Sequence, residues 1–87
     1  MEARISLLID FEAERDRLIQ LQNNGELDDM ARDDSYQDMV NRLDEHYRHK
    51  EYTDWSLDIY DVHKIMGILE KSPLIESYQN VINYLNS

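Results

Sequence analysis

The chain contains no cysteine, one proline and two glycines among its 87 residues. Without cysteine it has no disulfide and no thiolate metal site, as is typical of a cytosolic protein. A domain of this length is near the lower limit for a self-sufficient hydrophobic core, and nothing covalent supplements that core. The few glycines and prolines leave few positions for turns, and the sequence therefore favours long helices.

A long uninterrupted apolar run is also missing. The densest stretch, residues 5–11, is broken by Ser6 and Asp10 and preceded by Glu2. A signal peptide needs a basic start and an unbroken apolar run, and a membrane span needs about 20 apolar residues. We therefore expect a soluble, cytoplasmic protein that does not bind membranes. At 41 % apolar residues the chain is too hydrophobic to be disordered, and we expect one acidic helical domain over residues 1–87.

Apolar residues recur at the spacing of an α-helix, and strand-like alternation is nowhere sustained. We predict an all-α fold, a small antiparallel bundle of about four helices. The first predicted helix spans residues 3–23 and ends at Gly25, which can take the left-handed C-terminal position. The second spans residues 36–49 with Ser35 as its N-cap. Its apolar arc contains Tyr36, Met39, Val40, Leu43 and Tyr47.

The third predicted helix starts near Thr53 or Asp54 and ends before Ser72. The fourth begins there, with Ser72 as its N-cap and Pro73 at its first helical position. The aligned apolar face of the third helix contains Trp55, Ile59, Val62, Met66 and Leu69, whereas Leu57, Tyr60 and Ile68 point away from it. The buried side of the fourth contains Leu74, Ile75, Tyr78, Val81, Ile82 and Leu85.

The segment 26–34 has two interpretations. Leu27, Met30 and Ala31 can form a short extra helical turn over residues 26–32, or the segment can extend the second helix backwards. Short polar side chains compete for backbone N–H groups, so the aspartates at 33–34 favour a break before Ser35.

The first predicted helix has more apolar surface than a small bundle needs. Leu7, Phe11, Leu18 and Leu21 share one side, while Ile5, Leu8, Ile9 and Ile19 share another. A helix that is apolar around most of its girth is enclosed on several sides. Either this helix is central in the bundle or its second face meets another chain. We favour the second alternative and predict a homodimer, with Leu8 and Leu21 as its self-association residues.

Negative charge is concentrated in the middle of the chain. Residues 26–61 hold twelve carboxylates against four Lys and Arg side chains, which is −8 of the total net charge of −10. Such a surface, with aromatic residues between the charges, suits a basic partner and repels nucleic acid. Tyr52 is the preferred anchor, because Trp55 aligns with the predicted core. The predicted partner-binding residues are Asp33, Asp34, Asp38, Tyr52, Asp54, Asp58 and Asp61.

No set of residues indicates catalysis or a bound metal. The chain has no Gly-rich phosphate loop, no thiol and no serine in an elbow-like context. Glu45, His46 and His49 can approach one another, but they match neither the zinc-protease nor the di-iron pattern. Both histidines lie off the apolar arc, so we interpret them as part of a solvated helix face. The aspartates lack the order of a calcium loop. We expect that the protein is not an enzyme and that it binds neither a metal nor a cofactor.

The function that these features favour is binding. We expect a small acidic protein that binds and inhibits or regulates a basic partner, such as a nuclease or a nucleic-acid-binding complex. In charge and size the chain resembles the acidic helical inhibitors that phages and plasmids direct at restriction or CRISPR nucleases, some of which imitate DNA. One alternative is an immunity protein or antitoxin that neutralises a toxin nuclease. Others are a structural or regulatory oligomer without inhibitory role, and an acidic surface that only confers solubility.

Overall fold

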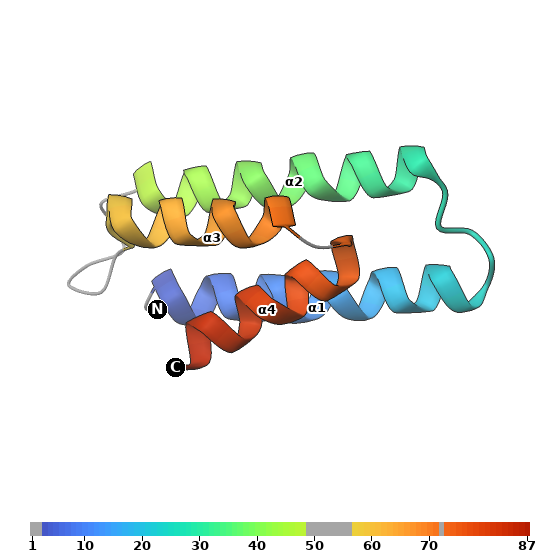
Figure 1. Cartoon of the computed structure of the whole chain (residues 1–87), viewed down its shortest axis with the longest axis horizontal. Helices are drawn as coiled ribbons and strands as arrows, with labels where there is room; N and C mark the ends of the chain where they lie inside the picture. The colour runs from blue at the N-terminus through green and yellow to red at the C-terminus, as the bar shows by residue number, and fades with distance from the viewer. Residues whose placement is uncertain (1–2, 49–56, 72) are drawn as a thin grey trace.

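The computed structural model describes residues 3–48, 57–71 and 73–87 and contains four α-helices in that part of the chain (Figure 1). These are α1 (Ala3–Asn23), α2 (Asp29–Arg48), α3 (Ile59–Lys71) and α4 (Leu74–Asn86). No strand occurs among the described residues. The predicted all-α fold is confirmed.

Consecutive helices run in opposite directions, and each packs against two others. In Figure 1, α2 and α3 lie side by side above α1 and α4. Contacts join α1 to α2, α2 to α3, α3 to α4 and α4 back to α1. The result is the predicted antiparallel bundle, with extents of 42 × 23 × 22 Å. None of the four described helices has the length and apolar character that crossing a membrane requires.

α1 has the bounds that the sequence predicted, and it ends in a Schellman motif. The backbone N–H of Glu26 donates to the carbonyl of Leu21 at 2.8 Å, and that of Gly25 donates to Gln22 at 3.1 Å. Gly25 has a φ of 73°. Glycine takes this left-handed conformation without the steric cost that a Cβ brings, so the helix ends here.

α2 starts earlier than the sequence predicted. The carboxylate of Asp28 accepts the backbone N–H of Ala31 at 2.8 Å, and the Asp28 carbonyl accepts that of Arg32 at 3.0 Å. The break expected at residues 33–34 and the N-cap expected at Ser35 are wrong. A cap at Asp28 already satisfies the first-turn donors, and polar residues that face solvent do not interrupt a helix.

α3 begins with a reciprocal pair of caps. The carboxylate of Asp58 accepts the backbone N–H of Asp61 at 2.9 Å, and the carboxylate of Asp61 accepts that of Asp58 at 3.4 Å. This is the geometry of a capping box, here built from two aspartates. Leu57 and Asp58 are not helical, so the expected continuous helix through these residues is wrong.

The buried face of α3 is rotated from the predicted one. Ile65 is fully buried, and Leu57, which precedes α3 and was expected to point away, is buried as well. Ile59, expected in the core, is 51 % exposed. Because α3 contacts both α2 and α4, it buries an arc that includes Ile68, which the sequence also placed outside the core. Tyr60 is exposed as predicted.

α4 follows a proline that acts as its N-cap. Pro73 has φ −51° and ψ 149°, and its carbonyl accepts the backbone N–H of Ser77 at 2.8 Å. Pro73 therefore precedes the first helical residue instead of occupying that position as predicted. The side of α4 predicted to be buried faces the core, where Tyr78, Val81, Ile82 and Leu85 are its buried apolar members.

Four sequence predictions about the fold lie outside the described residues. They are the end of the second helix at His49, the start of the third at Thr53 or Asp54, the core position of Trp55, and the N-cap role of Ser72.

α1 contributes three fully buried side chains to the centre of the core. Leu7, Phe11 and Leu18 of α1 have no exposed surface. Phe11 packs edge-on against Tyr78 of α4, with ring centroids 5.4 Å apart and an interplanar angle of 79°. Edge-to-face aromatic pairs stabilise a fold beyond the area that they bury. One face of α1 is therefore an integral part of the bundle.

Candidate functional site

Three of the predicted partner-binding residues lie together on α2. Asp33, Asp34 and Asp38 are all exposed. The structure adds Asp44 and Glu45, which are also exposed and follow on the same helix. At 100° per residue these five side chains lie on the side of α2 that is turned away from the buried residues Met39 and Leu43. We call Asp33, Asp34, Asp38, Asp44 and Glu45 the acidic face of α2.

The other predicted residues do not join this face. Asp58 and Asp61 lie at the start of α3, which is beside the C-terminal end of α2, whereas Asp33 and Asp34 are near its N-terminal end (Figure 1). Tyr52 and Asp54 lie outside the described residues. The predicted set is therefore divided between the two ends of the bundle.

Asp61 is occupied within the fold. Its Oδ1 accepts hydrogen bonds from the Tyr84 hydroxyl at 2.7 Å and from Arg4 at 3.1 Å, so it joins α3 to α4 and α1. Burial opposes ionisation here, but the hydrogen bonds from Tyr84, the Asp58 backbone and Arg4 hold the pKa of Asp61 below its ordinary value. This geometry gives Asp61 a structural role, and its neutralisation is expected to weaken the fold.

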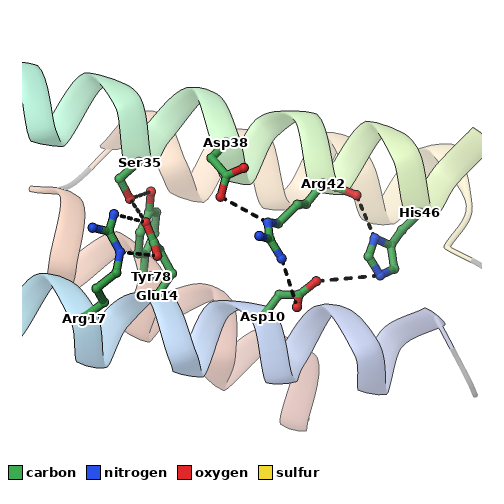
Figure 2. Close-up of polar contacts among 8 residues, drawn as sticks. All are labelled: Asp10, Glu14, Arg17, Ser35, Asp38, Arg42, His46 and Tyr78. Carbon is green, nitrogen blue, oxygen red and sulfur yellow. Dashed lines mark hydrogen bonds and ion pairs between the residues drawn. The ribbon is translucent and has the colours of Figure 1, made fainter.

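A row of polar side chains joins α1 to α2 (Figure 2). Near its middle, Arg42 of α2 lies 3.3 Å from the carboxylate of Asp10 on α1 and 3.1 Å from that of Asp38 on α2. One guanidinium thus holds a carboxylate of each helix. Asp38 is half of this bridge as well as a member of the acidic face of α2.

A hydrogen-bond chain crosses the bundle next to this bridge (Figure 2). The hydroxyl of Ser35 donates to Glu14 at 2.6 Å and lies 2.9 Å from the Tyr78 hydroxyl. Since the proton of Ser35 points to Glu14, Tyr78 is the donor to Ser35. Arg17 completes the chain with two hydrogen bonds to Glu14, at 2.7 and 2.8 Å.

The pKa values of this chain follow from its contacts. Hydrogen bonds from Arg17 lower the pKa of Glu14 against the opposing effect of burial, and Ser35 adds to the lowering. Burial raises the pKa of Tyr78 to about 12. The chain is therefore stable with Glu14 ionised and Tyr78 protonated.

His46 is buried at 6 % exposure, which corrects the interpretation of a solvated face. Its Nδ1 lies 2.7 Å from the carbonyl oxygen of Arg42, which can only accept, so Nδ1 carries a proton. Its Nε2 lies 3.0 Å from the Ser6 hydroxyl and 3.9 Å from Asp10. This contact joins α2 to α1 next to the ion pair between Arg42 and Asp10.

Sequence reasoning missed both buried polar residues of α2. Ser35, Met39, Leu43 and His46 follow one another at helical spacing, yet only the two apolar members were assigned to the core. The signal in the sequence was this helical spacing, together with polar residues on the first helix that can hydrogen-bond to Ser35 and His46, namely Ser6, Asp10 and Glu14. Among the described residues, no group of three or more His, Asp and Glu side chains is placed to hold a metal ion.

The predicted self-association residues, Leu8 and Leu21, are partly buried and pack against the core. The apolar side chains of α1 that face outward are Ile5, Ile9 and Ile19. A homodimer through α1 stays a prediction, and these isoleucines are better placed for any contact with another chain.

Comparison of the chain with protein-family models, with curated proteins and with solved structures finds no match.

Proposed function

We propose that this protein binds a basic partner through the acidic face of α2 and thereby inhibits or regulates it. The observation that carries the proposal is the run of exposed carboxylates along one helix. Residues 29–45 contain six carboxylates, all exposed, over about 24 Å of helix axis. Arg32 and Arg42 are the cations in this stretch, and each is paired with a carboxylate of α2.

The spacing of these charges favours an enzyme that binds nucleic acid as the partner. The five carboxylates of this face lie over about 18 Å of helix axis, or one per roughly 3.6 Å, and one net charge per roughly 4.5 Å remains once Arg42 is counted. The spacing along one DNA strand is about 3.4 Å per phosphate. A basic groove that accepts a phosphate backbone therefore complements this helix in charge. Inhibition follows if α2 occupies the groove in place of nucleic acid, as an anti-defence inhibitor of a nuclease would.

Capture followed by an activity assay tests this proposal. The tagged chain should recover a basic nucleic-acid-binding enzyme from host lysate and reduce the nuclease activity of the recovered enzyme. D33N/D34N/D38N should recover less of it and inhibit less. The control is E26Q/E70Q/E76Q, which removes the same number of negative charges at exposed positions outside this face.

The proposal is contradicted if both variants inhibit as well as the unmodified chain, or if the recovered partner is not basic. The identity of the partner also distinguishes the proposed inhibitor from an immunity protein, because an immunity protein would capture a toxin nuclease. A chain that recovers only copies of itself favours the oligomer alternative.

A further inference from the structure

α1 carries two stripes of side chains at the same spacing on opposite sides. The inner stripe is Leu7, Phe11, Glu14, Leu18 and Leu21, whose leucines and phenylalanine belong to or pack against the core. The outer stripe is Ile5, Ile9, Glu12, Asp16 and Ile19, which lies two residues earlier along the chain throughout. Both alternate steps of four and three residues, the spacing at which one helix packs along another.

The outer stripe has the side chains of a helix-packing surface but no helix upon it among the described residues. Ile5, Ile9 and Ile19 are 46 %, 49 % and 37 % exposed. Asp16 is exposed and Glu12 partly so. The stripe extends about 21 Å from Ile5 to Ile19, or four helical turns. It is thus apolar at both ends and acidic in the middle.

The inner stripe shows how a carboxylate is accommodated in such a position. Glu14 is the third residue of the inner stripe, and Glu12 is the third residue of the outer stripe. Arg17 binds it with two hydrogen bonds, and Ser35 supplies another from the neighbouring helix. In the inner stripe the cation comes from α1 itself, whereas in the outer stripe Arg15 of α1 binds Oδ1 of Asp16 at 2.9 Å. A helix packed on the outer stripe must therefore present cationic donors to Glu12 and to the second oxygen of Asp16, because a carboxylate oxygen without a donor is costly to bury.

A second copy of this chain does not meet that requirement. The outer stripe contains no cation, so in any register Glu12 and Asp16 of one copy would face carboxylates or isoleucines of the other. Arg15, beside the stripe, is held by Asp16 at 2.9 Å and by Gln79 at 2.9 Å. The net charge of −10 on each copy adds repulsion.

We infer that the outer stripe of α1 binds an amphipathic helix of a partner protein, with apolar side chains at its ends and Lys or Arg opposite Glu12 and Asp16. This inference rests on the proposed function for the basic character of the partner, and it adds a second surface and the kind of segment that fits there. Apolar contacts supply affinity, and the two carboxylates determine register and exclude acidic helices.

Designed peptides test the stripe without the natural partner. Two 21-residue helical peptides, one for each direction, carry Leu opposite the isoleucines and Arg opposite Glu12 and Asp16. A register control for each has the same composition, with both Arg moved to the opposite face. Titration into the ¹⁵N-labelled chain at 0.15 M NaCl should show at least tenfold tighter binding of one matched peptide, with amide shifts concentrated between Ile5 and Ile19.

Paired variants of the chain sharpen the result. Ile9→Ser should weaken binding of the matched peptide about tenfold, whereas Ile59→Ser, at an isoleucine of equal exposure on α3, should not. E12K/D16K should bind a peptide with two glutamates at these positions more tightly than the matched peptide with two arginines.

Equal affinity for the matched and register-control peptides, or amide shifts confined to α2, would overturn the inference. D33N/D34N/D38N should bind the matched peptide normally, so failure of the proposed function at α2 is distinguishable from failure here.

Discussion

At the scale of single residues, α1 and α2 are joined by polar contacts at the positions where a small bundle usually has apolar ones. Ser35 and Tyr78 are almost fully buried. The Tyr78 hydroxyl bonds to Ser35, and the Ser35 hydroxyl in turn donates to Glu14. A buried polar group without a partner costs more free energy than a satisfied one gains. Such a chain therefore penalises any other register of α1, α2 and α4.

Removal of the Ser35 hydroxyl, the middle group of this hydrogen-bond chain, should reveal the free-energy cost of an unsatisfied buried hydroxyl. Ser35→Ala leaves the Tyr78 hydroxyl without its partner and removes one of the two donors to Oε2 of Glu14, and it should lower the free energy of unfolding by about 1–3 kcal/mol. Urea denaturation measures this change. Ser87→Ala, which removes an exposed hydroxyl at the end of α4, is the control and should cost less than about 0.5 kcal/mol. Equal stability of the two variants would show that the chain does not stabilise the bundle.

Tyr78 should make the fold sensitive to alkali. Its pKa is about 12 in the folded protein and close to 10 when unfolded. Between these values the folded state keeps a proton that the unfolded state releases, so stability falls as pH rises from 10 towards 12. The loss at pH 12 is at most about 2.7 kcal/mol. Tyr78→Phe should lack this component, and urea midpoints between pH 8 and 11.5 measure it. Parallel curves for both proteins would contradict the assignment.

At the scale of helices, sequence reasoning succeeded where the local chemistry decides the structure. The end of α1 follows from Gly25, and the buried side of α4 follows from regular apolar spacing. It failed where tertiary contacts decide. Asp28 rather than Ser35 caps α2, because Ser35 has partners on two other helices. The rotation of α3, which buries Ile65 and exposes Ile59, depends on neighbours that no local pattern contains.

The two glycines provide an experiment at this scale. Gly25 has a φ of 73°, which a residue with a Cβ adopts only with strain, so Gly25→Ala should cost about 1 kcal/mol. Gly67 lies inside α3 with no atom within 4 Å of an added Cβ, so Gly67→Ala should stabilise by about 0.4–1 kcal/mol. Thermal or urea unfolding of both variants measures the difference. The same sign for both would contradict the assigned end of α1 or the helical setting of Gly67.

At the scale of the whole molecule, it matters less how many carboxylates the chain has than which of them are exposed on α2 and which are bound within the fold. The candidate site was predicted in part: Asp33, Asp34 and Asp38 do share an exposed face, because neighbours on one helix stay neighbours in the fold. Asp58 and Asp61 could not be separated from them by sequence, since their position depends on how α3 packs. Asp61 is bound by Arg4 and Tyr84, two residues far away in the chain.

This division predicts how a partner should bind. Long-range attraction speeds association, and the carboxylates that point to solvent produce most of it. Asp33 and Asp34 on the acidic face of α2 are exposed carboxylates of this kind, whereas Asp61 is held inside the fold. Charge removal at Asp33, Asp34 and Asp38 should therefore slow association and leave dissociation almost unchanged. The stability of the bundle should change by less than about 0.5 kcal/mol, because the lost Asp38–Arg42 pair is exposed and within one helix, and Arg42 keeps its partner Asp10 on α1.

The association rate of the captured partner, measured against NaCl concentration, tests the central claim most directly. Surface-based kinetics from 0.05 to 0.5 M NaCl would compare the unmodified chain, D33N/D34N/D38N and E26Q/E70Q/E76Q. We predict that the α2 variant associates about tenfold more slowly at low salt and with a flatter salt dependence, while the control resembles the unmodified chain. Superimposable curves for all three proteins would contradict the claim, because the acidic face of α2 would then only keep the protein in solution.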